Sequence, residues 1–190
     1  MKDQENADGM GRDRRNILKL ALAANATLLI PWVSGLASAK AVRKPPQDCP
    51  AHAAERFLKS MNCSQAILET YGPSMEMSVE DARRVAAAFA GGMGMGSECG
   101  AVTGAFMVIG MKYGKTTDKD PGADQLTFAK VAEFVNEFKA RHTHLRCSDL
   151  LGTDMGTPEG VKEAEAKGLF TTACPKYVRT AAEILDKLLV

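Results

Sequence analysis

Hydrophobic positions recur with a helical period along the chain from residue 51 onwards, and no segment alternates convincingly between apolar and polar residues. Apolar side chains three and four residues apart predict helices over 51–71, 79–89, 101–113, 123–141 and 175–189. Shorter helical turns are expected at 147–151 and after Thr157-Pro158, because proline is favoured at the first helical position. The pattern therefore predicts an all-α fold with a single domain of about five or six helices.

Two of these helices have distinctive faces. The segment 101–113 is apolar almost all round and has thirteen residues, too few for a membrane span of about 20, so we expect a buried central helix. Gly104 and Gly110 within it should let a neighbouring backbone come close. The segment 123–141 is the cleanest amphipathic helix, and its expected buried side consists of Phe128, Val131, Ala132, Val135 and Phe138.

The first 39 residues have the features of an export signal. Asp13-Arg14-Arg15-Asn16-Ile17-Leu18-Lys19 matches the twin-arginine pattern, and an apolar stretch from Leu20 to Ile30 follows it. Ala37-Ser38-Ala39 then has the small residues that signal peptidase cuts after. We expect a signal peptide over 1–39, a tether over 40–49, a helical domain over 50–190 and a periplasmic location; an uncleaved anchor is the alternative.

The charge of the mature chain limits its partners. Removal of residues 1–39 takes away five of 24 basic and four of 23 acidic residues, which leaves 19 of each. A net charge of zero gives no support to nucleic-acid binding or to long-range attraction to an anionic membrane, so we expect neither nucleic acid nor stable membrane insertion after cleavage. The remaining 151 residues fit one domain that does not depend on disulfides.

Four widely spaced cysteines are the main candidates for chemistry. Cys63, Cys99, Cys147 and Cys174 are separated by 36, 48 and 27 residues, so no short ligand loop can be drawn and only a fold can bring them together. On a continuous helix over 51–71, Cys63 projects away from the apolar stripe. The other three fall at expected helix starts, where unpaired N–H groups and the helix dipole favour thiolates.

Other motifs carry weaker signals. The run 91–96 is not a phosphate loop, since it follows a helix; its glycines either bring N–H groups close to sulfur or form a flexible turn. Cys49 and His52 lie beside the tether, apart from the other cysteines, and are weak candidates for metal ligands. His142 and His144 close the long helix, where a cationic histidine is favoured.

Four ordered blocks carry a resemblance to a known family. They are Asn62-Cys63-Ser64-Gln65-Ala66, Cys99-Gly100-Ala101-Val102-Thr103-Gly104-Ala105, Arg146-Cys147-Ser148-Asp149-Leu150-Leu151-Gly152, and Cys174 leading into Ala181-Ala182-Glu183-Ile184-Leu185. With these blocks the chain resembles the redox-active C_GCAxxG_C_C family over about residues 50–189. In the central block the cysteine precedes the glycine rather than following it. Cys49 lies outside the blocks.

The resemblance implies a cofactor. The family is similar to the iron–sulfur portion of the split-Soret cytochromes, which are helical homodimers. It therefore implies a two-iron, two-sulfur (2Fe-2S) cluster held by Cys63, Cys99, Cys147 and Cys174, and a homodimer. The chain has no Cys-x-x-Cys-His sequence, so covalent haem is not implied.

We therefore expect an exported electron carrier rather than an enzyme; the sequence does not identify its redox partner protein. Two alternatives use the same four cysteines. One is a thiol–disulfide oxidoreductase, although the chain lacks the Cys-x-x-Cys unit that usually lowers a nucleophilic thiol's pKa. The other is an interaction module with a structural zinc ion.

Overall fold

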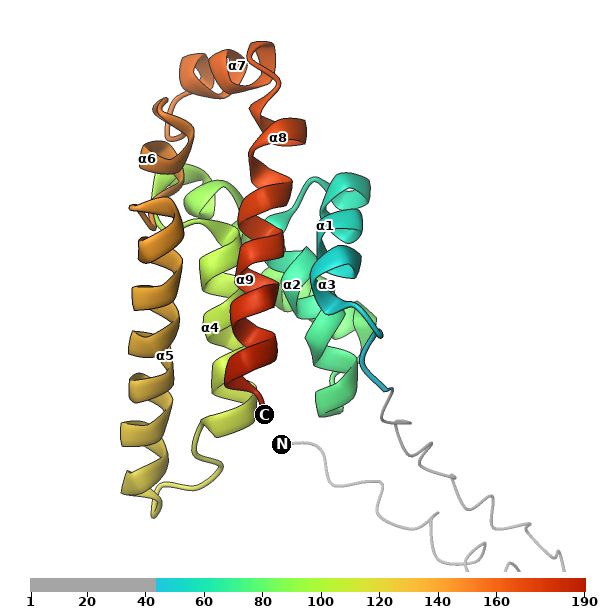
Figure 1. The fold of residues 1–190 in the computed structure, drawn as a ribbon, viewed down its shortest axis with the longest axis vertical. Coiled ribbons are helices and arrows are strands. Elements are labelled where there is room, and N and C mark those ends of the chain that lie inside the picture. Colours follow the sequence, from blue (N-terminus) through green and yellow to red (C-terminus); the bar gives the residue numbers. More distant parts are fainter. Residues whose placement is uncertain (1–43) are drawn as a thin grey trace, which may run out of the picture. The chain divides into compact units, whose positions relative to one another are not determined.

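The computed structural model describes residues 44–190, and within this range the chain is built from helices, with one isolated β-bridge and no strand. The all-α prediction is confirmed. The described residues fall within one compact unit, Lys40–Val190, while the predicted signal peptide lies outside them. The helices, shown in Figure 1, are α1 (Cys49–Ser60), α2 (Cys63–Tyr71), α3 (Val79–Ala86), α4 (Gly100–Tyr113), α5 (Pro121–His142), α6 (Cys147–Leu151), α7 (Pro158–Ala166), α8 (Leu169–Thr172) and α9 (Cys174–Leu188).

The chain forms more helical segments than the five or six expected, because some continuous patterns are interrupted. The helix expected over 51–71 is two helices. Met61 adopts a left-handed conformation with φ of 52°, which ends α1, and the Asn62 side chain accepts a hydrogen bond from the Gln65 N–H, which begins α2. The turn α8 was not predicted at all. Cys63 is consequently the first residue of α2, so the interpretation that it projects from a continuous helix is wrong.

The main core is formed by α1, α2, α4 and α9, and α5 packs against α4 and α9. Gly104 allows α4 to approach α2 closely, since a Cβ at this position would lie 3.1 Å from both the Ile67 Cβ and the Ser64 carbonyl oxygen. The same prediction for Gly110 is wrong, because no neighbour lies within 4 Å of a Cβ there. Among residues 44–190, no helix is long and apolar enough to cross a membrane.

Helix α5 buries only part of the face that was expected, with Phe138 in the core as predicted. Phe134 and Phe138 are fully buried, whereas Phe128, expected in the core, is 70% exposed. Phe134 packs edge-on against Phe106 of α4, with ring centroids 5.8 Å apart. In Figure 1, the N-terminal end of α5 extends beyond the C-terminal end of α9.

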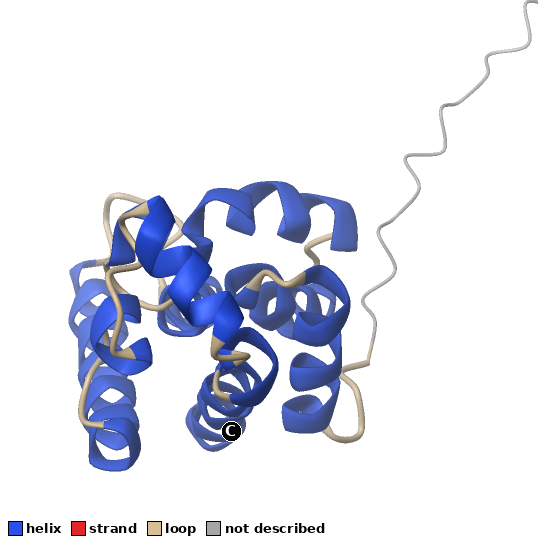
Figure 2. Ribbon diagram, turned by 90° about the horizontal axis from the view of Figure 1, so that it is seen from above, coloured by secondary structure: helices blue, strands red, loops and turns tan. Residues whose placement is uncertain are grey.

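Helices α6, α7 and α8 cover one end of the bundle, as seen at the top of Figure 1 and from above in Figure 2. They enclose a second, smaller hydrophobic cluster formed by Cys147, Leu151, Met155 and Ala164. Thr157 caps α7 by accepting from the Gly160 N–H, and Pro158 is its first residue, as predicted. This end cap and the main bundle meet where α9 begins.

Candidate functional site

The four candidate cysteines line one cavity of about 320 Å³. Cys63 and Cys99 belong to the main core, Cys147 belongs to the end cap, and Cys174 packs against both clusters. The cavity therefore lies at the junction of the two clusters. Apart from the cysteines and the Tyr177 hydroxyl, its wall is apolar, and no histidine or carboxylate lines it. The other lining residues are Phe57, Met61, Ala90, Gly91, Leu150, Leu151, Met155 and Phe170.

The isolated β-bridge between Glu98 and Arg146 brings two of these cysteines together. The Cys99 N–H donates to the Leu145 carbonyl at 2.8 Å, and the Cys147 N–H donates to the Ser97 carbonyl at 2.6 Å. Successive side chains of an extended segment point to opposite faces. Cys99 and Cys147, each next to a bridged residue, therefore lie on the same face of this short ribbon, opposite Glu98 and Arg146.

Cys63 approaches the backbone at the start of α4. A Cβ on Gly100 would lie 2.6 Å from the Cys63 Sγ, 3.0 Å from the Phe89 carbonyl oxygen and 3.1 Å from the Ala90 Cα. Only glycine leaves this space free. The sequence alone did not single out Gly100, although it directly follows Cys99 in the second block. After the larger effect of Cys99, the backbone N–H groups of Gly91 and Gly100 also lower the pKa of Cys63.

The run 91–96 brings one of these N–H groups to sulfur through an unusual backbone. Gly91, Gly92, Met93 and Gly94 all have positive φ, between 59° and 68°, and Gly96 has φ of 67°. Glycine adopts this region at no steric cost, which explains why four of these five positions are glycine. Of the two interpretations left open by the sequence, the hydrogen bond from Gly91 favours the one in which the run supplies N–H groups to sulfur.

Helix α9 begins at Cys174, one residue earlier than the predicted start at 175. Tyr177 lies three residues further on, on the same side of the helix. The Tyr177 hydroxyl donates to the Leu150 carbonyl at 2.7 Å, which ties α9 to α6 across the cavity. The sequence analysis did not identify Tyr177 as part of this site. Its spacing of three residues from Cys174 on a helix was the available signal, because residues three apart share a face.

The electrostatic environment separates Cys63 from the other cysteines. The Cys99 thiol donates a hydrogen bond to the Cys63 sulfur, and this bond, with the backbone N–H groups, lowers the pKa of Cys63 despite its burial. The same bond, together with burial, raises the pKa of Cys99. Burial raises the pKa of both Cys147 and Cys174 to about 12.

All three predicted helix starts are confirmed: Cys99 is the N-cap of α4, and Cys147 and Cys174 are the first residues of α6 and α9. The pKa of each of these three cysteines is raised, contrary to the prediction that their positions favour thiolates. The free-energy cost of burying a thiolate away from water exceeds the stabilisation that the helix N-terminus provides. Cys63 differs, because its interaction with Cys99 and, to a smaller extent, nearby backbone N–H groups lower its pKa.

The arrangement brings soft donors together without forming a closed single-ion site. Among residues 44–190, no three histidine, cysteine, aspartate or glutamate side chains are placed so that they could hold one metal ion. Chemically, the cavity offers one hydrogen-bonded sulfur pair, Cys63 and Cys99, and two further sulfurs from the end cap and α9. Thiolates suit iron–sulfur clusters, zinc and copper(I).

The weaker candidates lie elsewhere. Cys49 is buried at the start of α1 beside Tyr71 and Asp186, and burial raises its pKa to about 11. The His52 ring hydrogen-bonds Thr70, away from the cysteine cavity. His142 ends α5 as expected, but burial lowers its pKa, so the cationic form predicted there is disfavoured.

Comparison with known proteins places this cavity in a family context. No curated protein and no solved structure matches the chain. One family model matches residues 61–188, and its description is "Putative redox-active protein (C_GCAxxG_C_C)". The match contains all four cavity cysteines and excludes Cys49. Since it covers well over half of the 190 residues, the chain belongs to the C_GCAxxG_C_C family.

Proposed function

We propose that the protein is an exported electron carrier that holds an iron–sulfur cluster, of the 2Fe-2S type, through Cys63, Cys99, Cys147 and Cys174. The observation that carries the proposal is the single cavity lined by all four sulfurs. When bound, such a cluster supplies a one-electron redox centre whose potential depends on burial and on hydrogen bonds to sulfur.

The residues of this chain fit that group in three respects. The donor set is four cysteines and nothing harder, which is the usual set for a 2Fe-2S cluster. Gly91 and Gly100 direct N–H groups at the Cys63 sulfur, and such bonds stabilise the thiolate form that a metal requires. The apolar wall keeps water away from the sulfurs.

A cluster of two irons and a single zinc ion make different demands on the four sulfurs. A structural zinc ion needs four ligands at about 2.3 Å from one point. No three ligands of the described chain converge in this way. In a cluster of two irons the four cysteines are shared between the metals, so only pairs of sulfurs need to approach closely. Cys63 and Cys99, which interact through their side chains, are the pair we assign to one iron.

A second candidate function has one specific observation in its favour. Cys63 has a lowered pKa and accepts a hydrogen bond from Cys99, which resembles a nucleophilic thiolate beside a resolving thiol. In this function the two thiols would reduce a substrate disulfide to two thiols and would themselves become the Cys63–Cys99 disulfide, with two electrons and two protons transferred. Burial of both sulfurs counts against it, because a protein substrate must reach the attacking thiolate.

Metal and sulfide analysis distinguishes these functions. The full chain, isolated anaerobically before export, should be brown and contain iron and acid-labile sulfide in equal amounts. Cys99→Ser should lose the visible absorbance, whereas Cys49→Ser, outside the cavity, should retain it. One zinc per chain and no colour would contradict the proposal. A metal-free wild type that forms the Cys63–Cys99 disulfide on exposure to a disulfide substrate would favour the second function.

Export and assembly need separate tests. Twin-arginine transport moves folded proteins, which would let cofactor insertion precede export. Replacing Arg14 and Arg15 together by lysine should retain the protein in the cytoplasm; continued export of that variant would contradict the twin-arginine route. The homodimer is checked by light scattering on the loaded protein, and a monomer would remove that part of the proposal.

A further inference from the structure

We propose that a second, polar cavity between α1, α2 and α3 binds a small oxyanion, either a carboxylate or a phosphate. This cavity has a volume of about 280 Å³ and shares no lining residue with the cysteine cavity. Its charged lining residues are Lys44, Arg56, Glu69 and Arg83, and the remainder are Pro46, His52, Thr70, Pro73, Ser74 and Val79.

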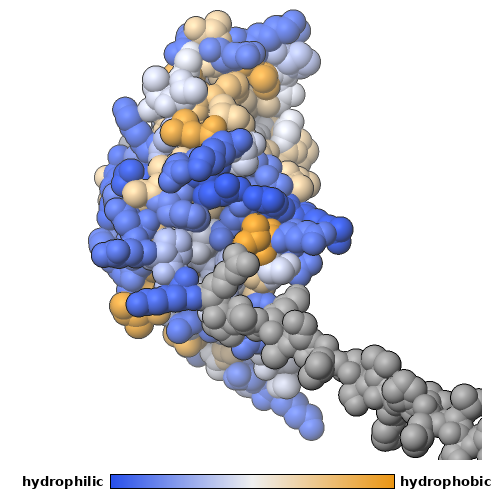
Figure 3. Space-filling view, turned by 90° about the vertical axis from the view of Figure 1, so that its right-hand side faces the viewer, coloured by the Kyte–Doolittle hydropathy of each residue, from blue (hydrophilic) through white to orange (hydrophobic). Residues whose placement is uncertain are grey.

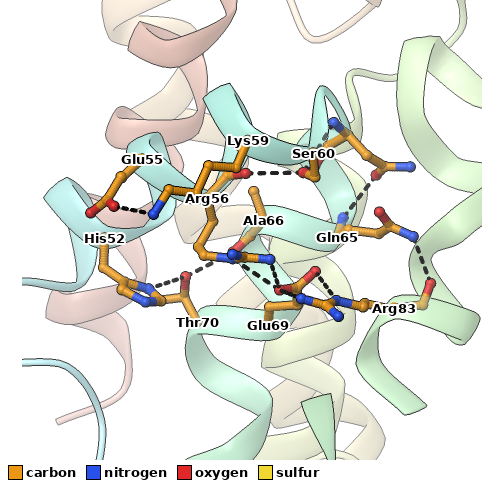
Figure 4. Close-up of polar contacts among 11 residues, drawn as sticks. His52, Glu55, Arg56, Lys59, Ser60, Gln65, Ala66, Glu69, Thr70 and Arg83 are labelled. Atoms are coloured by element: carbon orange, nitrogen blue, oxygen red, sulfur yellow. Dashed lines mark hydrogen bonds and ion pairs between the residues drawn. The ribbon is translucent and has the colours of Figure 1, made fainter. Parts of the chain in front are cut away.

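The residues that line this cavity have an excess of positive charge. Glu69 on α2 is buried, with 3% of its side chain exposed, and both Arg56 of α1 and Arg83 of α3 pair with it. Figure 4 shows the two guanidinium groups meeting at this one carboxylate. One of the two positive charges is therefore not neutralised by Glu69, and Lys44 at the rim adds another. Excess positive charge in a hollow attracts anions.

Both arginines use the same edge of the guanidinium group for Glu69. Arg56 donates from Nε and Nη2 to the Glu69 Oε2, at 3.0 and 2.6 Å. Arg83 donates from Nε to Oε1 at 2.9 Å and from Nη2 to Oε2 at 3.2 Å. A guanidinium has five N–H donors, so each arginine retains the edge that contains Nη1. That edge matches a carboxylate or phosphate in a bidentate geometry.

Burial and solvent access differ between the groups in a way that suits a binding site. The Arg83 side chain is 52% exposed and that of Arg56 is 22% exposed, so a solute can reach both. The buried Glu69 carboxylate meanwhile holds both guanidinium groups in place through its ion pairs. A fixed guanidinium loses less side-chain entropy when it binds an anion. Figure 3 views the molecule from the side that carries α1–α3, where hydrophilic residues separate the apolar patches, so this face does not resemble a large apolar docking surface.

The size and lining of the cavity limit the ligand. A volume of about 280 Å³ admits a phosphate or a short dicarboxylate but is at the small end for drug-sized ligands. The described walls offer two prolines and a valine, and their one aromatic ring is the His52 imidazole, whose Nδ1 is hydrogen-bonded to Thr70. The geometry therefore points to a compact multivalent oxyanion rather than to a nucleotide.

Two neighbouring arginines on α3 make a matched pair for the test. Arg83 lines the cavity, whereas Arg84 pairs with Glu80 outside it and is 75% exposed. Malonate and inorganic phosphate are titrated separately into the full chain by calorimetry, at constant ionic strength. At least one should bind, Arg83→Gln should weaken that binding about tenfold or more, and Arg84→Gln should leave it within about twofold.

Each outcome decides the proposal. Binding of malonate alone assigns the site to carboxylates, binding of phosphate alone assigns it to phosphate, and binding of both supports the shared chemistry. Absence of binding by either, or equal weakening by both substitutions, would overturn the proposal and leave the three side chains as a structural tie between helices. Should Arg83→Gln fail to fold, Lys44→Gln at the exposed rim replaces it, with a smaller loss of affinity expected and an unchanged affinity contradicting the site.

Discussion

Gly100→Ala tests the close contact on which the geometry of the cysteine cavity depends. The added Cβ would lie 2.6 Å from the Cys63 Sγ, where ordinary contact begins at about 3.4 Å, so the sulfur must move by roughly 0.8 Å or the helix must shift. Overpacking of this kind costs about 1–3 kcal/mol. Alanine gains little helix propensity here because Gly100 is the first residue of α4. The net loss should be about 1–2 kcal/mol, which lowers the Tm of a domain of this size by about 2–8 °C.

Gly110→Ala on the same helix is the matched control. Its Cβ would meet nothing within 4 Å, and an alanine in the helix interior is favoured over glycine by about 1 kcal/mol, so its Tm should rise by about 1–4 °C. Thermal unfolding followed by circular dichroism measures both variants without any cofactor. A Gly100→Ala protein as stable as the wild type, beside a control that behaves as expected, would refute the steric reasoning. In the loaded protein, Gly100→Ala should also reduce the visible absorbance, a readout that rests on the proposed function.

Two further predictions concern the backbone and the pH dependence. Met93→Gly should stabilise the protein by about 0.5–1 kcal/mol, as measured by urea unfolding. Met93 has a left-handed conformation, and the strain that glycine removes there is larger than the free-energy cost of the greater entropy that glycine gives the unfolded chain. Met95→Gly, at a neighbouring position without positive φ, should destabilise the protein. Burial lowers the pKa of His142, so the unfolded chain binds the proton more readily and stability should fall as the pH drops below about 6.5. His142→Gln should flatten this slope, and an unchanged slope would assign the pH dependence to other groups.

Local patterns predicted the helices well where the signal is itself local. Ser78 caps α3 and Thr157 caps α7, at the helix starts that the sequence predicted, because an N-cap depends only on neighbouring N–H groups. Gly152 ends α6 in the left-handed conformation, which glycine adopts without steric cost. The prediction failed at Met61, where a left-handed residue divides one amphipathic pattern into two helices. Periodicity continues across such a break, so it cannot reveal that the direction of the chain changes.

Predictions of burial were less accurate than predictions of helices. Phe128 fits the apolar face of α5 but is mostly exposed, and Gly110 has no close neighbour although Gly104 has. In both cases the sequence identified a residue suited to packing. Whether another element lies opposite depends on the lengths and positions of helices that are distant in the chain. Sequence periodicity contains no information on that point.

The sequence by itself determined that the protein is helical, that it belongs with a four-cysteine pattern, and that three of those cysteines lie at helix starts. The helices and their starts follow from side chains within a few residues of one another, and the cysteine pattern follows from four short blocks that occur in order along the chain. Only the tertiary structure decided that the four sulfurs line one cavity, since this needs the Glu98–Arg146 bridge and the packing of the end cap on the bundle. It also decided which sulfur favours the thiolate. Burial and hydrogen bonding set that pKa, and both depend on residues far apart in the chain.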